Sequence, residues 1–274
     1  MKTLRYRSNG PDVYMLEELL VQLGYDVHIS TYFGKDTHDA VLDFQKKNAL
    51  VIDGIVGLKT WSKLIAKKEN LTKFNKKFLS EQNLIDFSEK FEVPLAAVKA
   101  VNEVESSGKG FLLDGRPRIL FEGHVFWRQL KKRGIDPEPL QNEYTKNVLY
   151  KSWTKKYYEG GEQEYDRIEK AAGMSDIDAV HDAAYASASY GAFQIMGFHF
   201  SILGYPNVDS FVADMYTHES AHLDAFGEFC RANNLIRHMQ QQNWTKFALG
   251  YNGPQQAKNN YDGKLKKAFE KYSR

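Results

Sequence analysis

The chain has 274 residues, with 37 Lys plus Arg against 35 Asp plus Glu and a formal net charge of +2. At roughly 150 residues per domain, this length predicts about two domains. The hydrophobic share of 42% excludes fibrous and disordered classes. The small net charge is not that of a dedicated nucleic-acid binder, so we expect no nucleic-acid partner.

The cysteine content and the hydrophobic runs indicate whether the chain needs an oxidising compartment, carries a signal peptide or enters a membrane. Cys230 is the only cysteine, so no disulfide can form within the chain, and we expect a small buried hydrophobe at this position. The first hydrophobic stretch is interrupted by Glu17 and Glu18, so no signal peptide is predicted. No run of ~18 apolar residues occurs, and we expect no membrane insertion.

The first 66 residues carry a compact helical pattern. Pro11 suits the first position of a helix and Gly24 ends it, while one face of the segment is apolar through Val13, Leu16, Leu20 and Leu23. Further short helices are predicted over residues 37–48 and around residues 60–65. The pattern apolar-Gly-x-x-Thr occurs at 33–37 and again at 56–60. It predicts a glycine-permitted turn followed by a helix that starts near Thr.

This region resembles the small three-helix peptidoglycan-binding domain of cell-wall hydrolases. The segments that carry the match are residues 23–25, 33–37, 40–41, 44–45, 53–57 and 60–61. The resemblance implies bacterial peptidoglycan as the partner. Related domains also occur as propeptides of zinc peptidases, so the module does not decide which enzyme lies beside it.

A lysine-rich, glycine-poor stretch follows, with six lysines and one acid between residues 63 and 77. These lysines form either a solvated linker or a site of weak attraction to an anionic polymer. We predict a domain at 1–66, a linker at 67–80 and a second domain at 81–274. The second domain is expected to be mostly helical, because no long strand with clean alternation occurs and a large parallel sheet is therefore not indicated.

Glu105 lies near the end of a helix predicted over residues 95–106. Val98, Val101 and Glu105 share one apolar stripe, whereas Glu103 points to the other side. Burial and the negative end of the helix dipole both raise the pKa of a carboxyl placed there, which suits a general acid. Periodicity alone leaves an alternative, in which Glu105 is an end-of-helix acid turned to solvent.

Segments that include Glu105 occur in the order seen in the lysozyme-like superfamily of goose-type lysozymes and lytic transglycosylases, at residues 105–106, 189–196 and 247–253. More narrowly, residues 85–265 resemble the N-acetylmuramidase domain of modular phage endolysins, through 104–111, 116–124, 251–254 and 260–261. The resemblance implies that Glu105 is the catalytic acid. It also implies hydrolysis of the β-1,4 bond between N-acetylmuramic acid and N-acetylglucosamine, with no cofactor.

The second carboxylate is open at this stage. Glu122 follows an apolar run, and it either contacts substrate as a second catalytic group or forms an ion pair with an arginine or His124. Asp114 is a further candidate. Lytic transglycosylases use a single acid, so a transglycosylase that leaves anhydro products is the alternative function.

A polar, aromatic groove is expected beside the acid. Its substrate-binding residues are predicted to be Ser189, Tyr190, Gln194, Tyr251 and Asn252. Packing and helix capping are the alternative roles for these side chains. Glycines at 191 and 253 are expected either to let sugar approach the backbone closely or to serve as turn residues.

His218, Glu219 and His222 match the H-E-x-x-H pattern, in which two histidines bind Zn²⁺ and the glutamate activates water. The longer form of that pattern needs Gly at 225 and His at 228, where this chain has Ala225 and Glu228. We therefore predict an ordinary amphipathic helix with no metal, and a zinc peptidase is the alternative.

Together these features predict a mainly α protein, with a three-helix peptidoglycan-binding module and a larger lysozyme-like domain. The expected function is that of a monomeric endolysin, which is located in the host cytoplasm before release and acts on the cell wall in the periplasm.

Overall fold

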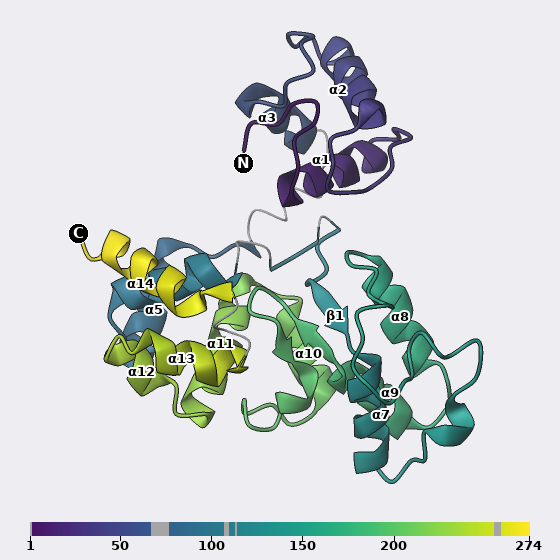
Figure 1. Cartoon of the computed structure of the whole chain (residues 1–274), viewed down its shortest axis with the longest axis vertical. Helices are drawn as coiled ribbons and strands as arrows, with labels where there is room; N and C mark the ends of the chain where they lie inside the picture. The colour runs from purple at the N-terminus through teal and green to yellow at the C-terminus, as the bar shows by residue number, and fades with distance from the viewer. Residues whose placement is uncertain (1, 67–76, 107–109, 113, 255–258) are drawn as a thin grey trace. The chain divides into compact units, whose positions relative to one another are not determined.

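The computed structural model describes residues 2–66, 77–106, 110–112, 114–254 and 259–274 (Figure 1). The chain divides into two compact units, one of residues 1–76 with 113–115 and one of residues 77–112 with 116–274. Helices dominate both units, as predicted. Within the described residues, no helix has both the length and the apolar character needed to cross a membrane.

The first unit is a three-helix bundle, as predicted, of α1 (Pro11–Gln22), α2 (Lys35–Lys47) and α3 (Leu58–Ala66). Helix α1 packs against both α2 and α3. An antiparallel bridge between Leu4 and Val56 joins the chain before α1 to the chain before α3. The core contains fully buried side chains from all three helices and the connections, namely Leu16, Leu20, Phe33, Val41, Val56 and Leu64.

The repeated apolar-Gly-x-x-Thr pattern has a different physical basis from the predicted one. Gly34 has a φ of −77°, which any residue adopts, so its role is not a left-handed turn. The buried Thr37 hydroxyl donates to Glu17 Oε1 at 2.7 Å. The buried Thr60 hydroxyl accepts a hydrogen bond from Gln45 Nε2 at 3.3 Å. Both threonines therefore connect a helix to a buried partner.

Gln45 organises the loop before α3. Its Nε2 donates to Asp53 Oδ1 at 2.9 Å and to the Ile55 carbonyl at 3.0 Å. Its Oε1 accepts from the Gly54 amide at 2.9 Å. The neighbouring Phe44 is buried in the core, so one half of the Phe-Gln pair fills the bundle and the other half shapes the loop.

The second unit begins with α5 (Glu81–Phe91), which Ser80 and Asn83 open as a reciprocal capping box. Within the described residues, the further named helical elements are α6 (Leu95–Val101), η2 (Asn102–Ser106), α7 (Gly123–Lys132), η3 (Glu138–Leu140), α8 (Gln163–Ala172), α9 (Asp178–Ala186), η4 (Gly197–His199), α10 (Val208–Met215), α11 (Glu219–Ala232), α12 (Ile236–Gln240), α13 (Trp244–Asn252) and α14 (Tyr261–Tyr272). The three strands are β1 (Ile119–Phe121), β2 (Ala188–Tyr190) and β3 (Ile195–Met196).

The second unit contains a small antiparallel sheet and two helices, α6 and α11, that each pack against several other elements. The strands follow the order β1-β2-β3, with Ile119 opposite Tyr190 and Tyr190 opposite Ile195. Helix α6 packs against α5, α12 and α14, and α11 packs against α5, α10, α12 and β3. Figure 1 shows α12, α13 and α14 grouped beside α5. Cys230 of α11 is completely buried, as expected, and burial raises the pKa of its thiol.

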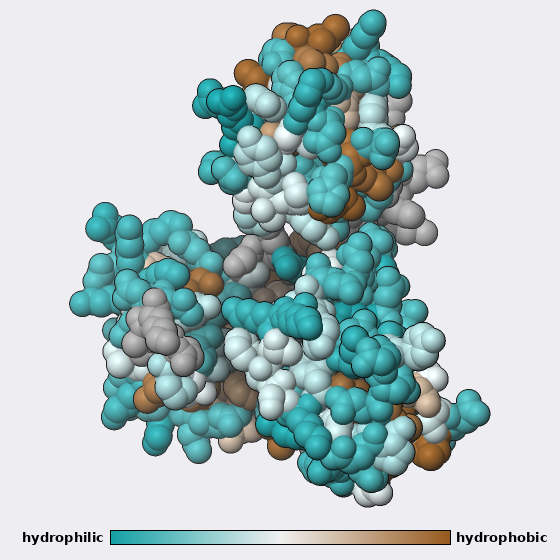
Figure 2. Space-filling model, turned by 45° about the vertical axis from the view of Figure 1, so that its right-hand side comes forward, coloured by the Kyte–Doolittle hydropathy of each residue, from teal (hydrophilic) through white to brown (hydrophobic). Residues whose placement is uncertain are grey.

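The surface of the second unit is largely hydrophilic on the face shown in Figure 2, with apolar side chains in small groups. In the first unit, the exposed apolar side chains include Val51, Ile52 and Leu58.

Candidate active site

Glu105 lies in η2, a π-helical turn that continues α6. The predicted single helix over 95–106 is therefore an α-helix that widens in its last turn, a deviation often found at functional sites. Asn252 Nδ2 donates to Glu105 Oε1 at 3.1 Å. Burial raises the pKa of Glu105 to about 7, although the hydrogen bond from Asn252 and the charge of Lys264 partly oppose this shift. The carboxyl group therefore holds a proton close to neutral pH.

Glu103 has the opposite surroundings, as its predicted orientation required. Its carboxylate is exposed and accepts hydrogen bonds from Lys271 Nζ at 2.6 Å and from the Tyr272 hydroxyl at 2.5 Å. These bonds lower the pKa of Glu103. Two glutamates two positions apart thus have pKa shifts of opposite sign.

Tyr251 connects the Glu105 region to the hairpin between β2 and β3. Its ring stacks on Phe247 with a centroid distance of 5.8 Å, and its hydroxyl donates to the Phe193 carbonyl at 2.7 Å. Burial raises the pKa of this hydroxyl strongly. That hydroxyl is thus bound to the backbone, and the expected contact of Tyr251 with sugar stays a prediction. Its neighbour Asn252 contacts Glu105 directly.

Ser189 and Gln194 lie together at the hairpin. The Ser189 hydroxyl donates to Gln194 Oε1 at 2.8 Å, and Gln194 Nε2 donates to the Gly191 carbonyl at 2.9 Å. Gln194 is exposed and has a φ of 51°, a left-handed conformation that is uncommon for this residue type. Its side chain is therefore held in one orientation at the surface, next to the residue whose carbonyl binds Tyr251.

Tyr190 does not belong to this surface. Its side chain is 1% exposed, its hydroxyl donates to the Tyr185 carbonyl at 2.9 Å, and its ring meets Phe211 edge-on. Successive side chains of a strand point to opposite faces, so the Tyr190 ring enters the core on the face of β2 opposite the Ser189 hydroxyl. The prediction that Tyr190 contacts substrate is wrong for this reason.

Glu122 lies immediately before α7. Both of its carboxylate oxygens accept from the Tyr158 hydroxyl, at 2.7 and 2.8 Å, and His124 Nδ1 lies 3.2 Å from Oε2. Burial raises the pKa of Glu122 and lowers that of His124. The expected pairing with an arginine is not direct, since Arg167 forms its ion pair with Glu164 at 2.7 Å.

Glu122 and Glu105 have different hydrogen-bond partners, Tyr158 for the first and Asn252 for the second. Strand β1 separates Glu122 from Arg118, whose carbonyl accepts from Gln194 beside the hairpin turn. Four extended residues span about 13 Å. Among the described residues, the groups that shift the pKa of Glu122 are Tyr158, Arg167, Glu164 and Arg128, and none of these acts on Glu105.

The H-E-x-x-H segment opens α11, and its three polar side chains, here called the α11 polar cluster (His218, Glu219 and His222), bind backbone groups. His218 is the N-cap, with Nδ1 accepting from the Ser220 amide at 2.9 Å. Glu219 accepts from the amides of Gly110 at 3.0 Å and Leu79 at 2.9 Å.

His222 is also occupied by backbone groups. Its Nδ1 accepts from the Ala192 amide at 3.2 Å, and its Nε2 lies 2.7 Å from the Met215 carbonyl, to which it donates. Burial lowers the pKa of His222 to about 4, so the ring is neutral near pH 7. The segment is therefore more than an ordinary amphipathic helix, because it binds the hairpin and the chain that follows Glu105.

Two glycines make room for this cluster. A Cβ on Gly191, which has a φ of 74°, would lie 2.6 Å from the His222 ring. A Cβ on Gly110 would lie 2.6 Å from Glu219 Oε1. Gly191 thus has the positive φ of the turn-glycine alternative, and its missing side chain allows close approach of His222. Gly253 has a φ of 71° and ends α13 as a turn residue.

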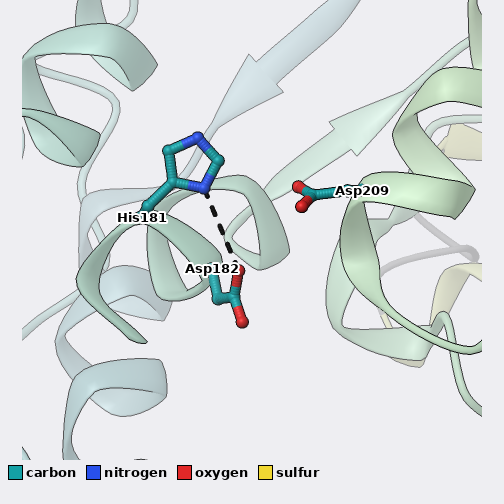
Figure 3. Close-up of side chains that lie close together, drawn as sticks. All are labelled: His181, Asp182 and Asp209. Atoms are coloured by element: carbon teal, nitrogen blue, oxygen red, sulfur yellow. Dashed lines mark ion pairs between the residues drawn. The ribbon is translucent and has the colours of Figure 1, made fainter. Parts of the chain in front are cut away.

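One group of side chains offers three possible metal ligands in the part of the chain that the structure describes. His181 and Asp182 of α9 and Asp209 of α10 each present one atom within 4.8 Å of the others (Figure 3). His181 and Asp209 are exposed, and His181 Nδ1 lies 3.9 Å from Asp182 Oδ1. These ligand atoms therefore lie near one another at the surface of the protein.

Residues 94–273 match the family described as Muramidase, N-acetylmuramidase. The chain belongs to the N-acetylmuramidase family. Residues 9–64 of this muramidase match the family described as "Putative peptidoglycan binding domain". The crystal structure of a Burkholderia AP3 phage endolysin is similar to the muramidase, with 41% identity over 99% of each chain and a TM-score of 0.68. The predicted fold class, the two module types and the glycoside hydrolase activity are confirmed.

Proposed function

We propose that this N-acetylmuramidase is an endolysin, in which the first unit binds peptidoglycan and Glu105 is the general acid of the second unit. The observation that carries the assignment of Glu105 is its shielded position in η2, where burial raises the pKa of the carboxyl to about 7. A general acid works best when its pKa lies near the pH at which it acts. In its role as an endolysin, the protein is held in the host cytoplasm until lysis and then acts on the wall.

The proton of Glu105 goes to the oxygen that leaves the glycosidic bond. As that bond breaks, positive charge develops on the sugar ring, and water adds to the sugar carbon with release of one proton. Lys264 and Asn252 favour the ionised form of Glu105 that exists after the transfer. The environment therefore keeps the acid protonated before the reaction and limits the cost of its ionised state afterwards.

We assign substrate contact to Asn252 and Gln194, and Ser189, which is 5% exposed, holds the Gln194 side chain. Asn252 contacts Glu105 and lies at the end of α13, and the hydrogen-bonded pair of Ser189 and Gln194 lies at the hairpin that Tyr251 connects to the same helix. Because these side chains are held by intramolecular bonds, little side-chain entropy is lost when sugar binds. Tyr251 acts as a positioning residue.

Glu105 acts in this proposal as the single carboxyl of the proton-transfer step. Both oxygens of Glu122 are bound to Tyr158, and β1 separates Glu122 from the hairpin. We propose that Glu122 supports the corner between α7 and the chain before α8. Glu122→Gln should therefore alter thermal stability more than it alters the rate of proton transfer.

Mass spectrometry of muropeptides after digestion of sacculi tests the proposed reaction. Hydrolysis yields fragments with reducing N-acetylmuramic acid ends, whereas a transglycosylase leaves anhydro ends that are lighter by one water. We expect reducing ends. Predominantly anhydro ends would overturn hydrolysis and leave Glu105 as the acid.

Pull-down on sacculi tests the division of labour. Binding through the first unit raises the local concentration of the active site at a polymeric wall. A chain of residues 1–66 should sediment with sacculi and lyse nothing, and residues 80–274 should cut soluble glycan at close to the full rate but sacculi more slowly. Equal sedimentation of the full chain and of 80–274 would show that the first unit has another role.

A further inference from the structure

A cavity of about 680 Å³ lies between η2 and α14 and has an excess of positive charge. Four cations and two carboxylates line it. The charges of Lys271 and Glu103 cancel, because Lys271 Nζ lies 2.6 Å from Glu103 Oε2. The groups that remain are Lys264, Lys267 and Arg274 against Glu270. Among the described residues, neither Lys267 nor Arg274 has an ion-pair partner.

The cavity begins next to the proposed proton donor. Glu103 and Val104, which line it, directly precede Glu105 in η2. Lys264 also lines it, and the charge of Lys264 lowers the pKa of Glu105. The cavity therefore shares Lys264 with the surroundings of Glu105, while its wall at Glu103 faces away from the Glu105 carboxyl. Its volume is in the range of pockets that hold small organic groups.

We propose, resting on the proposed function, that this cavity binds the carboxylates of the peptides that peptidoglycan carries on its N-acetylmuramic acid residues. Lys267 and Arg274 supply the positive charge, and a guanidinium can bind a carboxylate through two parallel hydrogen bonds. The peptide is covalently attached to the sugar beside the cleaved bond. It therefore reaches the cavity at a high effective concentration whenever the glycan is bound.

Glu103 does not oppose such a ligand. Its carboxylate receives hydrogen bonds from both Lys271 and the Tyr272 hydroxyl, which compensate its charge. The cavity thus remains favourable to an anion although an acid lies on its wall. Glu270 is exposed to solvent, as are Lys267 and Arg274, so salt screens all three charges alike and Glu270 offsets only part of the positive charge.

The test is a kinetic comparison of two variants on two substrates. The first variant is Lys267→Gln with Arg274→Gln. The matched control is Lys266→Gln with Lys246→Gln, which removes the same charge from exposed positions outside the cavity lining. The substrates are soluble, phosphate-free glycan strands with native peptides, and the same strands after their carboxylates are converted to methylamides with carbodiimide.

At low salt we expect the first variant to raise KM on native strands about three- to tenfold, the range expected for two exposed charge pairs, with kcat within about twofold of wild type. The control should change KM less than about twofold. On amidated strands, wild type and the first variant should have equal KM values. An equal rise in KM on both substrates, or no rise on native strands, would overturn the proposal. Failure of the proposed function has a different signature, since wild type would then cleave neither substrate.

Discussion

Two glutamates of the second unit, each in a segment that resembles a catalytic motif, have very different surroundings. Glu219 is 5% exposed, and its two oxygens accept backbone amides from Gly110 and Leu79. Glu105 is also shielded, but among the described residues its carboxyl accepts one side-chain hydrogen bond, from the Asn252 amide. Two backbone amides hold the Glu219 side chain in place. Burial with a single side-chain donor instead favours the protonated form of Glu105.

The same contrast extends to the residues around them. Every polar side chain of the α11 polar cluster binds a backbone group, and the backbone it binds includes the hairpin and the chain after Glu105. The cluster therefore holds the backbone of the hairpin and of the chain after Glu105 in place. The side chains proposed to take part in the reaction come from η2 and α13 instead. A motif of five letters does not distinguish these two uses, because both need polar residues one helical turn apart.

The largest expected effect is the loss of the acid. Glu105→Gln keeps size and polarity but cannot donate the proton, so kcat/KM should fall by ~10²–10⁴. Turbidity loss and muropeptide release measure this. Glu103→Gln is the matched control and should retain most of the activity, because Glu103 is bound to Lys271 and Tyr272. A folded Glu105→Gln protein with wild-type rates would remove Glu105 from the mechanism.

Disruption of the α11 polar cluster should act on stability. Glu219→Ala leaves two backbone amides without their acceptor, and we expect a loss of about 2–4 kcal/mol in the free energy of unfolding. His222→Gln, which keeps an acceptor and a donor, should cost less than His222→Ala. Denaturant unfolding measures both. An unchanged free energy of unfolding in Glu219→Ala would show that these bonds do not support the fold.

The pH dependence should differ in sign between Glu105 and Glu103. A glutamate in an unfolded chain has a pKa near 4.3, so the folded protein holds the Glu105 proton more tightly between about pH 4.3 and about pH 7. This contribution to stability is complete below the lower value and is lost as pH rises through about 7, by on the order of 3–4 kcal/mol. Activity should fall over the same upper limb as the acid ionises.

Glu103 supplies the contrast. Its pKa is lowered, so its contribution to stability is present at neutral pH and is lost as pH falls through the folded value. From pH 4 to pH 8, Glu105→Gln should gain stability relative to wild type, and Glu103→Gln should lose it. Thermal melts at both pH values measure this. Parallel behaviour of the two variants would contradict the assigned environments.

A smaller effect is expected from Asn252. Its hydrogen bond lowers the pKa of Glu105, so Asn252→Leu should move the basic limb of the kcat/KM profile to higher pH. The loss of a sugar contact should also raise KM, by about tenfold for one hydrogen bond. A pH profile with an unchanged basic limb would show that the bond does not act on the acid.

The smallest expected effect is that of chelation. Because both ring nitrogens of His222 are bound to backbone groups, EDTA should leave lysis unchanged. Loss of lysis on chelation, with recovery specific to Zn²⁺, would instead favour the zinc peptidase.

Local pattern was sufficient for much of the fold. The apolar stripe from Val13 to Leu20, with Pro11 and Gly24 at its ends, predicted α1 closely, because periodicity and backbone limits act within one segment. The shared stripe of Val98, Val101 and Glu105 similarly predicted a shielded carboxyl. The signal for the cavity beside η2 was also present, as basic residues one turn apart at 264, 267 and 271, but it could not be told from a solvated helix face.

The amino-acid sequence by itself determined the helical units, the position of Glu105 at a helix end and the opposite direction of Glu103, since these depend on neighbours within a few residues. Only the tertiary structure decided that Tyr190 is buried, that Glu122 binds Tyr158, and that Gly191 makes room for His222. These outcomes depend on which distant segments meet. Residue spacing cannot specify that, because strand register and the hydrogen bonds between elements are fixed by packing.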